Sequence, residues 1–351
     1  MRDRIARLRA QLEPLEAGSF LVTHPVNIRY LTGFESSNAA LVVRRDSVLL
    51  ATDGRYVDAA RAVAGVEVVE AERELAPFVG PRLGELAEPP VAFEATHVTY
   101  AAWEALGSGG TELRPARGVL ERLRSVKDDE ELAAIRRAAA RADAVYERLA
   151  GESLVGRSET DVAWSLVAAL HDAGADEPSF PPIVAAGPSA ARPHHHPGAR
   201  TIGRGETVIV DLGARLDGYC SDCTRTFVTD GLPGDLARAY ETCREAQAAA
   251  LEAVRPGASA REVDAVARTA IADAGYEVLH GLGYGVGLEV HELPRLAHTS
   301  DATLAVGNVV TVEPGVYLPG RGGVRIEDLV IVTDDGAEIL TRFSKDRVVF
   351  A

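Results

Sequence analysis

The segment Val208–Val228, VIVDLGARLDGYCSDCTRTFV, is the part of the chain that decides the fold of its second half. Two apolar runs rich in β-branched residues flank Asp217-Gly218, a dipeptide typical of two-residue hairpin turns. With the turn at this dipeptide, residue 211 pairs with residue 224. Asp222 then lies two positions from the partner of Asp211, and an even offset keeps both carboxylates on one face. Their backbones should lie within about 7 Å of each other.

Two carboxylates on one face of a buried hairpin are costly unless a cation or a proton neutralises them. Further acidic positions lie downstream, Glu313 in VVTVEPGVY and Glu327 in GGVRIEDLVIV. The order helix, helix, histidine-bearing loop, β-hairpin occurs twice in the second half of the chain. Two such halves packed face to face would bring all four carboxylates to a common centre.

The segment His280–Glu292, HGLGYGVGLEVHE, places two histidines in a run with glycine at every second position from Gly281 to Gly287. Glycine at this density lets a backbone pass close to a ligand, a metal or another strand. Carboxylates with imidazole suit Mn²⁺, Fe²⁺, Co²⁺ or Zn²⁺, and two ions about 3.5–4 Å apart can activate a hydroxide against a carbonyl. Each acidic residue alone is more often structural or solvated, but the combination favours a metal site.

Composition narrows the class of protein. The chain has 351 residues, enough for about two domains, and Lys+Arg 37 against Asp+Glu 52 gives a net charge of −15. This balance argues against sequence-independent nucleic-acid binding, which needs excess basic residues. No apolar run approaches the ~20 residues that span a bilayer, and the amino terminus lacks the apolar core of a secretory signal. With Cys220, Cys223 and Cys243 as the only cysteines, we expect no disulfide framework and a cytoplasmic location.

Residues 1–124 are predicted to form an α/β domain. We expect a helix from Ile5 to Leu15, a hairpin in AALVVRRDSVLLAT that turns at Arg45-Asp46, and a helix in DGRYVDAARAV capped by Asp53. Residues 125–351 form the second predicted domain. A helix from about Asp128 to Ala150 opens it, and a second helix follows with Ser158 as N-cap. The proline-rich loop DEPSFPPIVAAGPSAARPHHHPGAR comes next, and loops of this length are usually functional.

The segments VIVDLGARLDGYCSDCTRTF, HGLGYGVGLEVHELP, VVTVEPGVY and GVRIEDLVIV together resemble the pita-bread metallopeptidase family. That family includes prolidase, aminopeptidase P, methionine aminopeptidase and the metal-free creatinase branch. The resemblance covers nearly the whole chain. It implies an α+β fold, with a pita-bread (creatinase/aminopeptidase) catalytic domain over residues 125–351 and a smaller α/β creatinase-type N-terminal domain over residues 1–124.

By this resemblance, two divalent ions, Mn²⁺ or Co²⁺ before Zn²⁺, would be held by four ligands, Asp211, Asp222, Glu313 and Glu327. Asp222 and Glu327 would bridge both ions.

The resemblance also implies catalytic roles. His194, in RPHHHP, would shuttle the proton near the scissile bond, and His291 would contact the substrate carbonyl or stabilise the tetrahedral intermediate. Arg325, two residues before Glu327, would orient that carboxylate at the substrate site. Arg44 or Arg45, from a loop of this subunit or of a dimer mate, is the candidate for binding the free carboxylate of the substrate, with Arg45 preferred, because arginine pairs with carboxylates in a bidentate way. His195 and His196 receive no role beyond a surface loop.

Tyr284 departs from the family pattern, which has a metal-binding histidine in G-H-x-x-G where this chain has Gly283-Tyr284-Gly285. A phenol has a pKa near 10 and binds a divalent ion poorly until it is deprotonated. Tyr284 would therefore ligate as a phenolate, or step aside and weaken one metal position, or mark a metal-poor or inactive protein. Retention of all four carboxylates disfavours the last outcome. Tyrosine at this position also resembles the creatinase-like side of the family.

The resemblance implies a metal-dependent hydrolase that cleaves the Xaa-Pro bond of dipeptides through a metal-bridged hydroxide. Two alternatives are an aminopeptidase P acting on longer Xaa-Pro peptides and a metal-free creatinase-like C–N hydrolase with His194 as general base. A binding module on the same fold would have lost several ligands, whereas one is replaced here. The expected partner is a small peptide substrate, with no nucleic acid or membrane, and the expected assembly is a homodimer.

Overall fold

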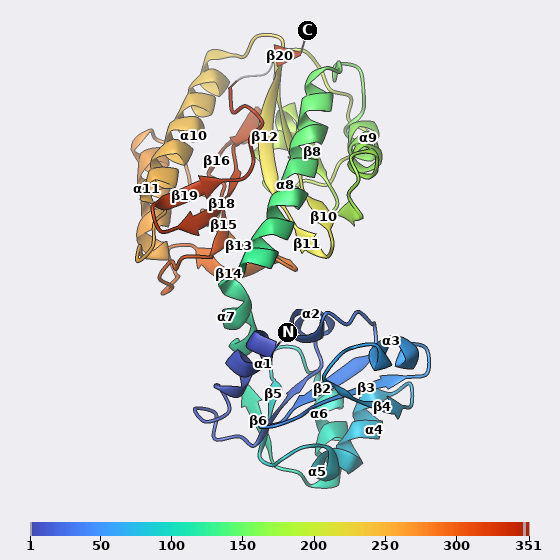
Figure 1. The fold of residues 1–351 in the computed structure, drawn as a ribbon. Coiled ribbons are helices and arrows are strands. Elements are labelled where there is room, and N and C mark those ends of the chain that lie inside the picture. Colours follow the sequence, from blue (N-terminus) through green and yellow to red (C-terminus); the bar gives the residue numbers. More distant parts are fainter. Residues whose placement is uncertain (1, 347–348, 351) are drawn as a thin grey trace. The chain divides into compact units, whose positions relative to one another are not determined.

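The computed structural model describes residues 2–346 and 349–350. The chain divides into two compact units, Met1–Arg124 and Ser125–Ala351 (Figure 1). Each unit has its own sheets and its own apolar core.

The N-terminal unit is built on a six-stranded sheet with the order β4-β3-β2-β1-β5-β6. Strand β1 is antiparallel to β2 and parallel to β5. The sheet is buried because its central strands consist almost wholly of apolar residues. The elements of this unit are α1 Arg2–Arg9, β1 Ser19–Val22, α2 Pro25–Thr32, β2 Ala39–Val43, β3 Val48–Asp53, α3 Val57–Arg61, β4 Glu67–Ala71, α4 Leu75–Val79, η1 Gly80–Arg82, α5 Leu83–Leu86, β5 Val91–Glu94, α6 Tyr100–Leu106, η2 Gly107–Gly109, β6 Leu113–Ala116 and α7 Val119–Ser125.

Two local predictions in this unit are wrong. The first helix ends at Arg9, and the chain continues in turns where a helix to Leu15 was expected. Helix α3 begins at Val57 rather than at Asp53. The Asp53 carboxylate instead accepts hydrogen bonds from the Arg55 guanidinium at 2.9 Å, a local pairing within the turn that competes with helix capping. The predicted hairpin is confirmed as β2 and β3, with Arg45 and Asp46 in its turn.

The second unit contains two main sheets, and each is covered by a pair of helices. The sheet β20-β12-β9-β8 shares a core with α8 and α9, and the sheet β14-β13-β15-β18-β19 packs against α10 and α11. The strands therefore lie between the two helix pairs (Figure 1). The elements are α8 Asp129–Ala150, α9 Glu159–Asp172, β7 Glu177–Pro178, β8 Ile183–Ala186, η3 Gly187–Ala191, β9 Glu206–Leu212, β10 Ala214–Leu216, β11 Tyr219–Cys220, β12 Cys223–Thr229, α10 Gly234–Ala253, α11 Ala260–Asp273, β13 Gly283–Val286, β14 Val290–Leu296, β15 Val309–Val312, β16 Gly315–Leu318, β17 Gly322–Arg325, β18 Asp328–Thr333, β19 Gly336–Ile339 and β20 Val349–Phe350.

Both helix starts predicted in this unit are confirmed. Helix α8 follows Asp128, whose side chain forms a capping box with Glu131. The Ser158 side chain accepts a hydrogen bond from the Asp161 backbone at the start of α9. The repeated order of two helices, a loop and strands is also present, because α10 and α11 precede the second sheet as α8 and α9 precede the first.

The predicted register of the Asp217-Gly218 hairpin is confirmed. Asp211 in β9 pairs with Thr224 in β12, and closer to the turn Arg215 pairs with Cys220. All three cysteines are buried free thiols. None of the helices in the described parts of the chain combines the length and apolar composition that a membrane crossing requires.

Candidate metal centre

Three carboxylates from the predicted set meet in the interior of the second unit. One oxygen each of Asp211, Asp222 and Glu327 lies within 4.8 Å of the others. Asp211 lies near the end of β9, Asp222 in the short link between β11 and β12, and Glu327 between β17 and β18. Asp211 is 8% exposed, and Asp222 and Glu327 are each 1% exposed. The two hairpins therefore converge on one buried acidic cluster.

Glu313 lies close to this cluster. It follows β15, on the strand opposite the one that carries Glu327. Val312 pairs with Asp328, and Gly315 pairs with Arg325, so Glu313 and Glu327 lie opposite each other where the two ladders meet. The carboxylate of Glu313 lies 3.8 Å from Arg325. The same hairpin thus supplies one acidic side chain from each strand.

Each carboxylate of the central trio uses one oxygen in a hydrogen bond. Asp211 Oδ2 accepts from Arg325 Nη2 at 2.6 Å, and Asp222 Oδ2 accepts from the phenol of Tyr284 at 2.6 Å. Glu327 Oε2 accepts from the Thr224 hydroxyl at 2.8 Å.

The remaining oxygens of this trio are buried without a hydrogen-bond partner among the described residues. They are Asp211 Oδ1, Asp222 Oδ1 and Glu327 Oε1. Unpaired buried anionic oxygens are strongly unfavourable, and a group of them is explained by a cation that they coordinate. An oxygen-rich donor set of this kind fits a hard divalent cation.

The carboxyl groups of the cluster have raised pKa values and therefore bind protons more tightly than exposed carboxyl groups do. Burial, and then repulsion from Asp211 and Glu313, raise the pKa of Asp222 well above its ordinary value. Burial, and then repulsion from Asp222, raise the pKa of Glu327 well above its ordinary value. Burial raises the pKa of Glu313 to about 8. Without a cation, the cluster therefore holds protons at neutral pH, and cation binding would release them.

Arg325 organises the cluster from its centre. Its Nε donates to Thr224 Oγ1 at 3.1 Å, and its Nη1 donates to the Tyr317 hydroxyl at 3.2 Å and to the backbone oxygen of Pro193 at 3.1 Å. With Arg325 only 4% exposed, these contacts and the bond to Asp211 account for most of its donors. The structure thus places Arg325 on Asp211 and, through Thr224, on Glu327. Arg325 also lines the cavity beside the carboxylates, and its contact with substrate stays a prediction.

A chain of hydrogen bonds runs from Arg325 through Tyr317 to a third histidine at the site, His280. Tyr317 accepts from Arg325, so its own hydroxyl is left to donate to His280 Nε2 at 2.9 Å. His280 Nδ1 then carries the hydrogen and donates to the backbone oxygen of Gly281 at 2.8 Å. Burial lowers the pKa of His280 to about 4, so this ring is neutral at physiological pH.

A cavity of about 400 Å³ opens beside the carboxylates. It contains both predicted catalytic histidines, and the residues that line it are Phe180, Ile183, Pro193, His194, Asp211, His280, Gly281, Gly283, Tyr284, Val290, His291, Arg295, Ala297, Glu313 and Arg325. The ring of His291 lies 4.3 Å from that of Tyr284, and burial, then His194 and Arg295, lower the pKa of His291. The backbone of His291 is left-handed, with φ of 70°, a strained conformation often found at functional sites.

Glycines in the His280–Glu292 segment allow neighbouring strands to pack closely against it. A Cβ atom on Gly283 would lie 2.0 Å from the backbone oxygen of Thr311, and one on Gly285 would lie 2.1 Å from that of Leu293. Strands β14 and β15 therefore pass against β13 at distances that only glycine permits. This packing places Tyr284 against Asp222.

Sequence reasoning missed two features of the site. Arg295 lines the cavity four positions after His291 in β14, an even spacing in the same strand that was a usable signal. His195, for which the sequence predicts no role, has its Nε2 2.7 Å from the fully buried carboxylate of Glu159. That contact joins segments 36 residues apart, so no local pattern indicates it.

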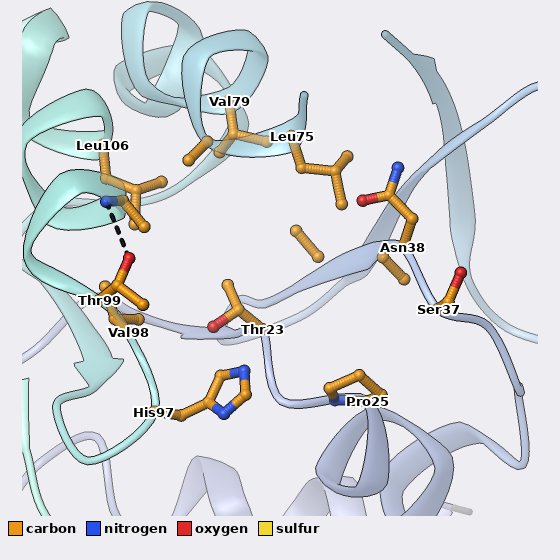
Figure 2. Close-up of a pocket in the computed structure, with 14 residues that line it drawn as sticks. Thr23, Pro25, Ser37, Asn38, Leu75, Val79, His97, Val98, Thr99 and Leu106 are labelled. Atoms are coloured by element: carbon orange, nitrogen blue, oxygen red, sulfur yellow. Dashed lines mark hydrogen bonds between the residues drawn. The ribbon is translucent and has the colours of Figure 1, made fainter. Parts of the chain in front are cut away.

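Arg45, the other predicted substrate residue, lies exposed at the β2–β3 turn of the N-terminal unit, and its role stays a prediction. That unit holds a separate cavity of about 290 Å³ (Figure 2). Leu75, Val79 and Leu106 form part of its apolar wall, and His97 lies opposite them (Figure 2). None of its lining residues is acidic, so among the described residues it offers no carboxylate for a metal.

Comparisons with known proteins agree with this architecture. The model of "Metallopeptidase family M24" matches residues 133–334, and that of the "Creatinase/Prolidase N-terminal domain" matches residues 4–126. The chain is 36% identical to "Uncharacterized peptidase YqhT" of Bacillus subtilis, over 99% of both chains. It is 33% identical to the "Xaa-Pro dipeptidase" of Pyrococcus furiosus, again over 99% of both. A solved "Xaa-Pro dipeptidase from Bacillus anthracis" superposes with a TM-score of 0.96 at 35% identity, covering 99% of each chain.

The acidic cluster, the two sheets that carry it and both family matches lead to one assignment. The predicted pita-bread catalytic domain and the creatinase-type N-terminal domain are confirmed by these matches. The chain belongs to metallopeptidase family M24 and carries a creatinase/prolidase N-terminal domain.

Proposed function

We propose that this protein is a metal-dependent dipeptidase that hydrolyses the Xaa-Pro bond. The observation that carries the proposal is the set of unpaired, buried oxygens on Asp211, Asp222 and Glu327 beside a cavity lined by His194 and His291. The similarity to proteins described as Xaa-Pro dipeptidases supports the substrate class.

The four acidic residues would hold two divalent ions, with Mn²⁺ or Co²⁺ ahead of Zn²⁺. Such ions supply a Lewis acid for the substrate carbonyl and lower the pKa of water. The family resemblance would make Asp222 and Glu327 the ligands shared by both ions, and one oxygen of each lies within 4.8 Å of the other and of Asp211. Tyr284 covers one oxygen of Asp222, so one of the two metal positions should bind more weakly.

His291 would act on the carbonyl oxygen of the scissile bond. Burial lowers its pKa, which favours a neutral ring that donates a single hydrogen bond at neutral pH. Its edge-on contact with Tyr284 holds the ring toward the acidic cluster. A donor fixed in this way can stabilise negative charge as it develops on the carbonyl oxygen.

His194 would transfer the proton to the departing nitrogen. It lines the same cavity as His291, and the two rings lie close enough for His194 to influence the pKa of His291. A proton shuttle must reach the nitrogen of the scissile bond from the side opposite to the carbonyl donor. Two histidines on one cavity wall can divide these tasks.

Arg295 would bind the free carboxylate of the dipeptide. Its guanidinium lies at the cavity and makes no hydrogen bond or ion pair with the described residues, so its donors are available to a ligand. Arginine pairs with a carboxylate through two parallel hydrogen bonds. We therefore assign to Arg295 the role that the sequence suggested for Arg45.

A panel of peptides tests the substrate assignment. The protein loaded with Mn²⁺ is offered Ala-Pro, Ala-Ala and the tripeptide Ala-Pro-Ala, and release of amino acids is measured. Hydrolysis of Ala-Pro well above the other two supports the dipeptidase. Preferred cleavage of Ala-Pro-Ala would instead favour the aminopeptidase P alternative.

We also propose a homodimer in the cytoplasm, on the basis of the family resemblance and the absence of a disulfide framework. Light scattering coupled to gel filtration measures the mass directly. A mass equal to that of one chain at micromolar concentration would refute the dimer.

A further inference from the structure

The loop that carries His194 is attached to the rest of the domain on both sides of that residue. Pro193 precedes His194, and its backbone oxygen accepts a hydrogen bond from Arg325 Nη1 at 3.1 Å. His195 follows, and its ring contacts Glu159 Oε2 at 2.7 Å. His194 itself lines the cavity beside the acidic cluster. The proposed proton shuttle is thus flanked by two anchored neighbours.

Glu159 is the anchor on the second side, and it is unusual because its side chain is fully buried. It is the first residue of α9, where a carboxylate is favoured by the helix dipole. Its Oε1 accepts from the backbone of Ala186 at 3.0 Å, and its Oε2 accepts from that of Gly198 at 3.1 Å. His195 supplies the third donor. Since a carboxylate can only accept, His195 Nε2 must carry the hydrogen.

These contacts connect three segments through one side chain. Ala186 ends β8, Gly198 and His195 belong to the loop, and Glu159 begins α9. The backbone adds to the attachment, because Glu159 N donates to the Arg200 oxygen at 3.0 Å and Thr160 N donates to the Gly198 oxygen at 3.1 Å. A buried carboxylate with three donors resists displacement, since moving any donor leaves charge unsatisfied.

We propose that Glu159 and His195 form a positioning pair that, together with Arg325, fixes His194 at the cavity. Glu159 and His195 line neither the cavity nor the acidic cluster, so the pair would act on His194 through the loop that it anchors. Arg325 couples the other end of the loop to Asp211, so the shuttle and the metal ligand share one support. This inference rests on the proposed function of His194.

A double-mutant cycle separates positioning from general stability. His195→Ala is made in the full-length protein and in a His194→Ala background, and kcat and KM for Ala-Pro are measured across pH. Neighbouring His196, which is exposed and makes no hydrogen bond or ion pair with the described residues, provides the matched control as His196→Ala. His195→Gln keeps an N–H donor near the position of Nε2 and serves as the conservative variant.

We expect His195→Ala to lower kcat about 10- to 100-fold with KM changed less than about twofold, because a misplaced shuttle costs rate rather than binding. The limb of the pH profile that His194→Ala removes should shift in this variant. In the His194→Ala background, His195→Ala should have no further effect. His195→Gln should recover most of the rate, and His196→Ala should behave as the wild type.

The opposite results overturn the proposal. An equal loss in both backgrounds, or a rise in KM alone, would show that His195 does not act through His194. A wild type that fails to cleave Ala-Pro would instead refute the proposed function. In that case hydrogen–deuterium exchange decides the positioning pair by itself: His195→Ala must accelerate exchange in residues 192–200 while leaving β9 unchanged. Unchanged exchange in residues 192–200 would overturn it.

Discussion

The phenol of Tyr284 donates its hydrogen to Asp222 Oδ2 over 2.6 Å, in the position where the family resemblance places a histidine ligand. Burial, followed by the charges of Asp222 and Glu313, raises the pKa of Tyr284, so the phenol keeps its proton while no cation is present. Tyr284 has therefore not left the centre. Its hydroxyl occupies one of the two oxygens that Asp222 would use to hold a second ion.

Replacement of Tyr284 by histidine should strengthen metal binding. Neutral imidazole binds Mn²⁺ or Co²⁺ at pH 7, and the change frees Asp222 Oδ2. We expect the weaker ion of the Tyr284→His protein to bind about tenfold or more tightly by isothermal titration calorimetry. Tyr284→Phe, which only removes the hydroxyl, serves as the control. If both variants lose the weaker ion, Tyr284 is itself a ligand as the phenolate.

The metal-free protein should lose stability as the pH rises. Burial raises the pKa of Glu313 from 4.5 to about 8, so the folded state holds a proton that the unfolded chain releases. The resulting stabilisation is complete below about pH 4.5 and is lost as the pH rises through about 8. The pKa values of Asp222 and Glu327 are raised for similar reasons and act in the same direction.

Thermal unfolding in the presence of EDTA measures this effect. The melting temperature should fall between about pH 5.5 and about pH 8.5. Addition of Mn²⁺ should reverse the fall, with its largest effect at the alkaline end, because the ions replace the protons. Glu313→Gln should flatten the profile. A metal-free melting temperature that rises over this range would contradict the assigned proton affinities.

Loss of the Arg325 side chain should destabilise the protein. Arg325→Met would leave the buried acceptors on Asp211 and Pro193 without their donor. Removing one partner of a buried ion pair costs about 3–5 kcal/mol. Urea unfolding measures the difference in free energy, and Arg321→Met, at an exposed ion pair with Asp235, is a control expected to cost less than about 1 kcal/mol. Equal small losses would show that Arg325 does not organise the cluster.

Arg295 should determine affinity for the free carboxylate of the substrate. Arg295→Ala should raise KM for Ala-Pro by about tenfold or more while changing hydrolysis of Ala-Pro amide little, since the amide offers no carboxylate. Arg45→Ala is the matched comparison. A rise in KM confined to Arg45→Ala would restore the assignment made from the sequence.

The sequence predicted those parts of the site that depend on strand register. The Asp217-Gly218 turn fixed the offset between Asp211 and Asp222, because every pair in a ladder follows from one turn. Neither the contact of Arg325 with Asp211 nor that of His195 with Glu159 could be predicted in this way. Both join residues from different elements, and their geometry is set by tertiary packing rather than by local periodicity.

Asp53 shows the same limit on a smaller scale. An acidic residue ahead of a helix often caps it. Here the Asp53 carboxylate instead accepts hydrogen bonds from the side chains of Arg55 and Asn38. Arg295 is different, because its spacing from His291 in a strand was visible.

Release of proline from Ala-Pro by metal-stripped protein, before and after Mn²⁺ is restored, tests the central claim most directly. The buried carboxylates should make activity depend fully on the metal, and Asp222→Asn should remain inactive at any Mn²⁺ concentration that saturates the wild type. Activity that persists in chelator and survives Asp222→Asn would contradict the metal centre and favour the metal-free C–N hydrolase.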